Sequence, residues 1–321
     1  MVALAGGAGI AWRAGLFGRA ASGPVTRARI LMGTGVHLTV LGKDRDAAEA
    51  AADATLDRMA AAEGLLSRYL PASELSRLNA TGRLENASDD LLAVLRTADR
   101  FSRLGEGAFD VTIQPVLDLY RRGPGHVAPP PEAIERTLER VDYRAIRIEG
   151  RTVTLARPGM GLTLDGVGKG HVIDRGVATL KERGFDDVFV EAGGDLFAAG
   201  RKARGDTWRI GIRSPRPGAT LQARFDASNL AVATSGDYQQ PFSPDFARHH
   251  ILDPRTGVSA PELASSTVSA PNAASADALA TLTMVLGPRR GRELIEALPG
   301  CEAYFVSKSL DVTRTSGFEV V

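Results

Sequence analysis

The sequence predicts an α+β fold in which largely antiparallel or mixed sheets are flanked by helices. From residue 143 onward, strand-like segments with a hydrophobic period of two mostly follow one another, whereas the helical segments are gathered in groups. Hydrophobic residues make up 44% of the 321 positions and charged residues 24%, which is typical of a globular protein with a sizeable core. Neither a linker nor a repeat interrupts the chain. We therefore expect one domain over residues 28–321, preceded by a tail of residues 1–27.

The first half of the chain is predicted to form one strand followed by a series of helices. Residues 28–41 alternate in polarity and are rich in β-branched side chains, which favours a strand. Apolar residues then recur at helical spacing in the segments 44–66, 73–79, 88–104 and 113–120. Ser88 or Asp89 is placed to cap the third segment, and Pro115 suits the first turn of the fourth. Residues 123–131, rich in glycine and proline, are predicted to form a loop.

The second half is predicted to contain mostly strands. Residues 144–150 and 152–157 are expected to pair as a hairpin. Further strands are predicted over 187–191, 196–200, 207–213, 221–225, 229–234, 250–252, 265–270 and 301–306. Helices are predicted over 170–183, 275–286 and 289–298. Gly184 follows the first of these helices, at a position where helices commonly end.

Charge and cysteine content exclude two classes of function. The formal net charge is +1, which argues against nucleic acid as the main partner, because phosphate binding normally requires a basic excess. The single cysteine, Cys301, rules out an intramolecular disulfide and a cysteine metal cluster. We expect Cys301 to be a buried structural thiol near the end of a helix.

Polar residues of three kinds lie between residues 231 and 287. Residues 234–237 (Thr-Ser-Gly-Asp) are predicted to form a turn rich in hydrogen-bond donors and acceptors. His250 stands just before a Pro-Arg-Thr-Gly turn, where a catalytic or a structural role is open. Asp277 and Thr281 are four residues apart in an apolar run, so on a helix their oxygens lie on one face. A hard cation such as magnesium takes ligands of that kind, although an ordinary polar helix face has the same spacing.

Three further motifs contain glycine. The segment GVGKG at 166–170 precedes a predicted helix and resembles a phosphate-binding loop, with Lys169 adding a positive charge, but it lacks the Walker spacing. A plain glycine turn is the alternative. The segment GAFD at 107–110 fits a core phenylalanine beside a helix-capping aspartate, and EAGGD at 191–195 fits a tight turn.

Six segments occur in an order that resembles the ApbE family of FAD:protein FMN transferases. They are MGTGVHLTV, SRYLPASELSRLN, GEGAFDVTIQPVLDLY, LDGVGKGHVIDR, EAGGDLFAAGRK and the stretch that joins AVATSGDY, HHILDPRTG and ADALATLTMVLG. Each segment alone is weak evidence for the family, but six segments in the family's order are specific evidence. The resemblance implies an ApbE-like fold with the active site in a central cleft, so that residues 28–321 would be the flavin transferase domain.

The resemblance also implies roles for individual residues. FAD contacts are implied for Met32, Tyr69, Ala108, Phe109, Asp110, Lys169 and Ile251. The family pattern has an aspartate six residues before the lysine, where this chain has Thr163; Asp165 is a candidate to replace that carboxylate. Magnesium ligands are implied at Asp277, Thr281 and the backbone carbonyl of Gly166. His250 matches the family histidine beside the reacting diphosphate, whereas His249 is expected to point the other way.

The reaction implied by the resemblance is magnesium-dependent transfer of FMN from FAD to a threonine hydroxyl, with release of AMP. His250 would be the general base, with Asp237 and Asp253 the next candidates. The acceptor would be a flavin-carrying domain of an electron-transfer protein. Three alternatives stay open: an FAD pyrophosphatase at the same site, a non-catalytic FAD-binding protein, and an electron-transfer flavoprotein that retains FAD.

The N-terminal tail has two interpretations. Residues 1–11 are almost wholly apolar and residues 20–23 resemble a cleavage zone, as in a signal peptide, but the first basic residue, Arg13, follows the apolar run. The tail is therefore either the remnant of a signal peptide or an ordinary exposed segment, and eleven apolar residues are too few to span a bilayer. The family resemblance favours export to the periplasm, with membrane association through the N-terminus as a further expectation.

Overall fold

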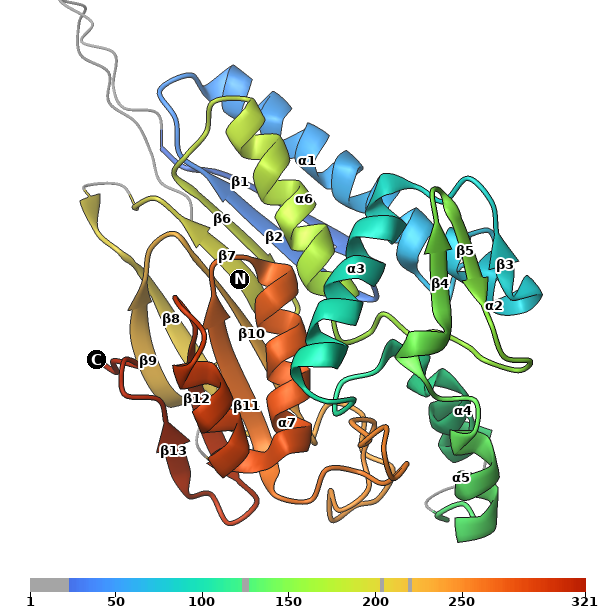
Figure 1. The fold of residues 1–321 in the computed structure, drawn as a ribbon. Helices are drawn as coiled ribbons and strands as arrows, with labels where there is room; N and C mark the ends of the chain where they lie inside the picture. The colour runs from blue at the N-terminus through green and yellow to red at the C-terminus, as the bar shows by residue number, and fades with distance from the viewer. Residues whose placement is uncertain (1–22, 123–126, 203–204, 219–220) are drawn as a thin grey trace, which may run out of the picture.

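An eight-stranded antiparallel sheet forms the centre of the protein (Figure 1). The computed structural model describes residues 23–122, 127–202, 205–218 and 221–321. The strands of this sheet, in spatial order, are β1 (Val25–Leu31), β2 (Thr34–Val40), β6 (Val188–Ala192), β7 (Asp195–Ala199), β10 (Leu230–Gly236), β11 (Leu263–Ala270), β12 (Glu302–Ser307) and β13 (Val312–Arg314). All eight positions of the interior strand β11 are buried, whereas the edge strand β1 is mostly exposed. The predicted α+β class with largely antiparallel sheet is confirmed.

Two smaller sheets flank the main one. The first joins β3 (Arg83–Leu84), β5 (Thr152–Leu155) and β4 (Ile146–Glu149). The second is the ribbon of β8 (Trp208–Arg213) and β9 (Leu221–Ala227). Trp208 and Phe225 of the ribbon share an apolar cluster with Leu196, Val232 and Val306 of the main sheet. The ribbon therefore covers part of the main sheet by burying apolar side chains against it.

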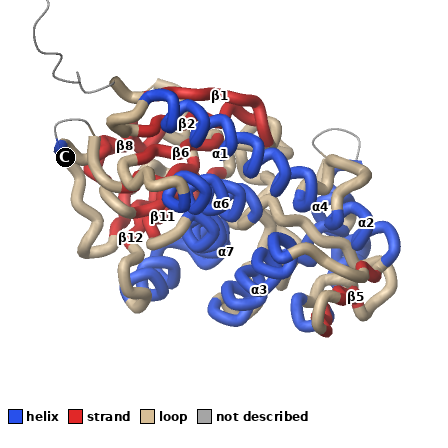
Figure 2. Tube along the Cα trace, turned by 90° about the horizontal axis from the view of Figure 1, so that it is seen from above, coloured by secondary structure: helices blue, strands red, loops and turns tan. Residues whose placement is uncertain are grey.

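Three long helices pack against the main sheet. They are α1 (Arg45–Leu66), α6 (Gly168–Glu182) and α7 (Ala273–Glu296). The other helices of the described ranges are α2 (Glu74–Thr81), α3 (Asp89–Leu104), α4 (Gln114–Arg122) and α5 (Pro131–Leu138). Figure 2 shows α1, α6 and α7 gathered on one side of the strands. Small residues let these helices approach closely: a Cβ on Gly176 of α6 would lie 2.8 Å from the Met59 sulfur of α1.

The helix starts agree with the sequence because their caps are encoded locally. The Asp44 side chain accepts from the Ala47 amide at 3.1 Å, Ser73 accepts from Ser76 at 2.9 Å, and Ser88 accepts from Leu91 at 3.2 Å. Each cap satisfies an amide that the helix itself leaves unpaired. Helix α6 ends at Glu182, and Gly184 has φ 84°, so the predicted glycine termination is confirmed.

The strand predicted over residues 28–41 is wrong, because this segment holds the end of β1, a turn and β2. Met32 and Gly33 form the turn, with φ of 53° and 71°. A two-residue hairpin loop of this kind needs positive φ at both positions. Methionine is an unusual residue there, so alternation seemed to continue across the turn. Strand β1 also begins at Val25, inside the predicted tail.

Other differences lie in and around the predicted loops. Residues 250–252 form no strand; only isolated bridges, Pro241–His249 and Leu252–Ser259, occur nearby. The predicted turn at 234–237 is wrong, since β10 runs through Gly236. The two helices predicted over 275–286 and 289–298 are the halves of α7, which is kinked at Gly287 before Pro288. Helix α5 and strands β3 and β13 were not predicted.

Two predictions fall partly on residues that the structure does not describe. They are the tail, of which residues 1–22 lie outside the described ranges, and the loop at 123–131, of which residues 123–126 do. Among the described helices, none combines the length and the apolar content needed to cross a bilayer. Cys301 is buried after α7, as expected, and burial raises the pKa of its thiol.

Candidate active site

A cleft of about 730 Å³ collects the candidate residues from segments far apart in the sequence. All thirteen candidates line it: Met32, Tyr69, Ala108, Phe109, Asp110, Thr163, Asp165, Gly166, Lys169, His250, Ile251, Asp277 and Thr281. They come from the β1–β2 turn, the segments before α2 and α4, the segment that leads into α6 and its first residues, the loop after β10, and α7. The volume is typical of a pocket for a sizeable small-molecule ligand.

Two buried carboxylates meet Lys169 at this cleft. Lys169 forms an ion pair with Asp195, whose other oxygen accepts from the Thr234 amide at 3.1 Å. Asp277 accepts from the Gly170 amide at 3.0 Å. Burial and the neighbouring Asp195 raise the pKa of Asp277 to about 7, although Lys169 acts in the opposite direction. A negative charge on Asp277 is therefore poorly compensated, and an additional cation beside it would be stabilised.

Thr281 and Gly166 contribute further oxygens next to Asp277. A Cβ on Gly166 would lie 2.9 Å from the Thr281 Oγ1, and that hydroxyl is 3.1 Å from the Ser235 Oγ. The position of Asp277 and Thr281 one helical turn apart on α7 is confirmed. Carboxylate, hydroxyl and backbone carbonyl oxygens are the ligands of a hard cation, so these residues fit magnesium. In the described ranges, no group of three or more His, Cys, Asp or Glu side chains gathers as a metal site.

Two glycines of GVGKG have their amides bonded within the protein and allow close packing. The Gly168 amide donates to the Leu164 carbonyl at 2.7 Å, and the Gly170 amide is taken by Asp277. A Cβ on Gly170 would lie 2.2 Å from the Ala273 carbonyl oxygen, so glycine is required where α6 meets the start of α7. These two amides are therefore not available as phosphate donors, because both are already bonded within the protein.

Lys169→Met is expected to lower the free energy of unfolding of the metal-free protein by about 3 kcal/mol, because it leaves two buried carboxylates without their cation. Magnesium is expected to restore part of the loss, since it supplies positive charge at Asp277. Chemical denaturation with and without magnesium measures both effects. Lys181→Met, on the exposed surface of α6, is the matched control. Equal stability of the Lys169 and Lys181 variants would contradict the prediction.

His250 faces the cleft, and its neighbour His249 does not. The Nδ1 atom of His250 is buried with no hydrogen-bond partner in the described structure. Burial and the neighbouring His249 and Arg121 lower the pKa of His250 to about 4, although Asp165 favours its charged form. His249 is bonded inside the protein: its Nε2 lies 2.9 Å from the Ala260 carbonyl, and its Nδ1 accepts from the Ile251 amide at 3.3 Å. The opposite orientations expected for the two histidines are confirmed.

Asp237 and Asp253 are not free to replace His250 as a base. Asp237 is fully buried and accepts two hydrogen bonds from Arg216, at 2.7 and 2.8 Å. Asp253 accepts two from the Arg255 guanidinium, at 2.8 and 2.7 Å. Neither carboxylate lines the cleft. The prediction that they are the next candidate bases is therefore wrong.

Comparisons with known proteins agree with this site. The sequence model of the ApbE family matches residues 32–305, which include every candidate in the cleft. The chain belongs to the ApbE family. A protein of Treponema pallidum named FAD:protein FMN transferase is 32% identical over 94% of this chain and 89% of its own length. A Vibrio cholerae protein of the same name is 34% identical over 72% of each chain.

Solved structures of ApbE proteins have the same fold. The flavin transferase ApbE of Vibrio cholerae superimposes with a TM-score of 0.79 and 28% identity, covering 92% of this chain and 98% of the other. The ApbE protein of Thermotoga maritima gives a TM-score of 0.83 with 28% identity, covering 91% and 97%. The likeness extends over nearly the whole of both proteins, so the cleft lies within the shared architecture.

At position 163, where the ApbE pattern has an aspartate and this chain has Thr163, the side chain stabilises a local turn. The Thr163 hydroxyl accepts from the Asp165 amide at 3.2 Å, a bond that an aspartate at position 163 could also form. The Asp165 carboxylate accepts from the Arg68 guanidinium, with distances of 2.9 to 3.2 Å. That guanidinium lies 4.1 Å from the centre of the exposed Tyr69 ring. Asp165 therefore helps to fix the position of the arginine beside Tyr69.

Asp110 has a structural role in addition to its place in the cleft wall. One of its oxygens accepts from the Thr112 amide at 2.8 Å and the Thr112 hydroxyl at 2.7 Å; the other accepts from the Tyr143 amide at 2.8 Å. Burial raises the pKa of Asp110, although these bonds favour the ionised form. The helix-capping interpretation of this aspartate is confirmed, because its side chain caps the short 3₁₀ helix at residues 111–113.

Sequence reasoning missed two residues of the site. Arg68 lies within the segment SRYLPASELSRLN, in which only Tyr69 was assigned a role from the sequence. Asp195 was assigned to a tight turn, since its motif carries no signal for a lysine partner 26 residues away. Their importance follows from contacts with Asp165 and Lys169 that only the folded chain creates.

Proposed function

We propose that this protein catalyses magnesium-dependent transfer of FMN from FAD to a threonine hydroxyl of a flavin-carrying protein, with release of AMP. As a member of the ApbE family with curated relatives of that name, the protein is an FAD:protein FMN transferase. The observation that best supports the finer reaction is the convergence in one cleft of an all-oxygen cation site, a lysine and an imidazole whose Nδ1 has no partner in the described structure.

The cleft offers different surfaces to the flat ring systems and to the diphosphate of FAD. Met32, Tyr69 and Phe109 supply apolar and aromatic surface that suits a flat ring system. Asp277, Thr281 and the Gly166 carbonyl would hold magnesium, which when bound would neutralise negative charge on the diphosphate. Lys169 adds a positive charge that Asp195 keeps in place.

His250 lines the cleft and is the proposed acceptor of the proton from the attacking hydroxyl. A pKa of about 4 keeps its imidazole neutral at physiological pH, so a ring nitrogen can accept a proton. The threonine oxygen would then form a bond to the phosphorus on the FMN side of FAD. The bond from that phosphorus to the bridging oxygen would break, and AMP would leave with that oxygen. In such chemistry, positioning and electrostatic stabilisation account for most of the rate.

An acceptor assay tests the proposed function. The protein, FAD and magnesium are incubated with purified flavin-carrying domains of electron-transfer proteins, each paired with a threonine-to-alanine variant. We expect a fluorescent acceptor band on a denaturing gel, AMP in equal amount, and no band with the alanine variant. Release of both FMN and AMP without labelling of any acceptor would instead identify an FAD pyrophosphatase. Bound FAD that is never consumed would identify a binding protein.

Asp165→Ala is expected to weaken FAD binding by about 1–3 kcal/mol, because it releases Arg68 and leaves donors at the cleft unpaired. Titration of FAD against the change in flavin fluorescence measures this affinity. Asp226→Ala is the control, since it breaks another aspartate–arginine pair, with Arg209 on the β8–β9 ribbon. Unchanged FAD affinity in the Asp165 variant would mean that this carboxylate only stabilises its own turn.

We further propose that the protein acts in the periplasm or after export, with membrane association through its N-terminus. The apolar residues 1–11 support this proposal, although residues 1–22 lie outside the described structure. Fractionation of cells expressing the full chain, with N-terminal sequencing of the product, tests it. Recovery of an uncleaved protein only from the cytoplasm would contradict it.

A further inference from the structure

We infer that Asp237, Arg216 and Lys308 form a buried charge clamp that positions the loop carrying His250. This inference rests on the proposed role of His250 in flavin transfer. The three residues lie outside the cleft lining and come from three separate parts of the chain: the segment after β10, the segment after β8 and the segment after β12. The clamp would act on the reaction only through the loop, so its members are positioning residues.

Asp237 is the centre of the clamp. Its side chain is fully buried, both of its oxygens accept from Arg216, and the Lys308 ammonium lies 3.6 Å from one of them. The Asp237 amide donates to the Ala264 carbonyl of β11 at 3.0 Å, which fixes the backbone to the main sheet. A bidentate arginine–carboxylate pair is directional, so it restricts the relative position of the two segments it joins.

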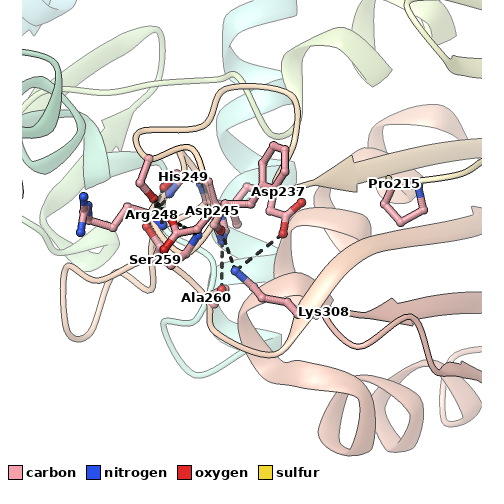
Figure 3. Close-up of polar contacts among 12 residues, drawn as sticks. Pro215, Asp237, Asp245, Arg248, His249, Ser259, Ala260 and Lys308 are labelled. Carbon is pink, nitrogen blue, oxygen red and sulfur yellow. Dashed lines mark hydrogen bonds and ion pairs between the residues drawn. The ribbon is translucent and has the colours of Figure 1, made fainter. Parts of the chain in front are cut away.

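Both cations of the clamp reach the tip of the loop at Phe246. The Arg216 guanidinium lies 4.5 Å from the centre of the Phe246 ring, and the Lys308 ammonium donates to the Phe246 carbonyl at 2.7 Å. Figure 3 shows Lys308 beside Asp237, with the residues of the loop next to them. Phe246 has φ 58°, a left-handed conformation that costs free energy for a bulky residue, so its surroundings must hold it there.

The tip is connected to His250 by backbone pairing. The Phe242 amide donates to the Arg248 carbonyl at 2.7 Å, Pro241 and His249 form a bridge, and the His250 amide donates to the Gln240 carbonyl at 3.1 Å. Residues 240–250 therefore form a small paired loop with Phe246 at its tip and His250 at its base. Asp237 holds the chain just before this loop, and its two cations hold the tip.

The His250 imidazole depends on this support, because the Gln240 backbone carbonyl that favours its charged form belongs to the same loop. Its Nδ1 has no hydrogen-bond partner in the described structure. The orientation of the ring is thus set by the backbone of the loop and by its neighbour His249, which is bonded to Ala260. Buried ion pairs add little net stability, since desolvation offsets their attraction. The clamp therefore contributes mainly by fixing the position of the loop 240–250, and not by adding stability.

Hydrogen–deuterium exchange of the metal-free protein tests the structural part of the inference. Removing Asp237 would leave two cations without a counter-charge and endanger folding, so we choose Arg216→Lys and Lys308→Met. Both variants are expected to increase amide exchange in residues 239–252 and to leave β12 unchanged. Arg209→Lys, on β8 and in an exposed ion pair with Asp226, is the control and is expected to change exchange in neither segment. Unchanged exchange in residues 239–252 would overturn the inference.

A mutant cycle with His250→Ala tests the catalytic part, with the acceptor that the gel assay identifies. Each clamp variant is expected to reduce kcat by about 10- to 100-fold in the wild-type background, the cost of a misplaced catalytic group, with a smaller change in the KM for FAD. In the His250→Ala background the same variants are expected to change kcat by less than about twofold. The reason is that the clamp acts on the reaction through the His250 imidazole, which this background lacks. Equal losses in both backgrounds would overturn the inference. If His250→Ala alone retains the wild-type rate, the proposed base is wrong, and exchange decides whether the clamp orders the loop.

Discussion

Asp277→Ala is expected to abolish magnesium-dependent FMN transfer and to leave the fold intact. Asp277 is the only carboxylate among the three residues that fit the cation, and its ionised form has no hydrogen-bond donor in the described structure other than the Gly170 amide. Without it, the Thr281 hydroxyl and the Gly166 carbonyl provide no charge to hold magnesium. The measurement is the transfer rate over a magnesium titration. An unchanged titration curve would show that the cation site is elsewhere.

Asp277→Asn separates the loss of charge from the loss of shape. An amide oxygen can still accept from the Gly170 amide, so the contact between α6 and α7 remains. The pKa of Asp277 is raised in the folded protein, so the folded state binds the proton more tightly than the unfolded state. Stability is therefore lost as pH rises from the ordinary aspartate value of about 4 to about 7, and it stays at the lower level above 7. At pH 8 without metal, the asparagine variant is expected to be at least as stable as the wild type in thermal unfolding.

The same pKa predicts how pH and magnesium interact in the wild type. Below about pH 7 a proton occupies Asp277, and magnesium must displace it. At low magnesium concentration, the transfer rate is expected to rise as pH increases through 7, and more magnesium is expected to move this rise to lower pH. A pH profile that does not depend on magnesium concentration would mean that Asp277 does not bind the cation.

His250→Ala is expected to bind FAD nearly as well as the wild type and to lose about 10²–10⁴-fold in transfer rate, the usual contribution of one acid–base group. His37→Ala, a replacement on the exposed surface of β2, is the control and is expected to keep the full rate. Flavin fluorescence titration measures FAD binding, and labelling of the acceptor measures the rate. Transfer at the wild-type rate would remove His250 from the mechanism and leave the family assignment unaffected.

The pH dependence assigned to His250 is distinct from that of Asp277. Burial of the imidazole lowers its pKa to about 4, so the neutral form that accepts a proton persists well below pH 6. With saturating magnesium, the rate is expected to stay level through the neutral range and to fall only as pH approaches 4. A fall centred near 6.5, the ordinary histidine value, would show that the ring is charged and solvated during turnover.

The local parts of this fold could be predicted because short-range chemistry encodes them. Asp44, Ser73 and Ser88 cap their helices with bonds to amides three residues away, and the period of two from residue 143 onward identifies most strands. The hairpin turn at Met32 was missed, since a methionine at positive φ is stabilised by the pairing of β1 with β2 and not by its own preference. The strand predicted at 250–252 failed for a related reason: the loop there is shaped by contacts with distant residues.

For the site, the sequence alone determined which residues to examine, through the order of six segments and the spacing of Asp277 and Thr281. Only the tertiary structure decided what surrounds them. It places Asp195 beside Lys169 and Arg68 beside Asp165, and it occupies Asp237 with Arg216. The physical reason is that ion pairing, burial and the resulting pKa shifts depend on distances between segments far apart in the chain. Spacing along the sequence fixes such distances within one helix or one turn, but it does not fix the distance between two separate elements.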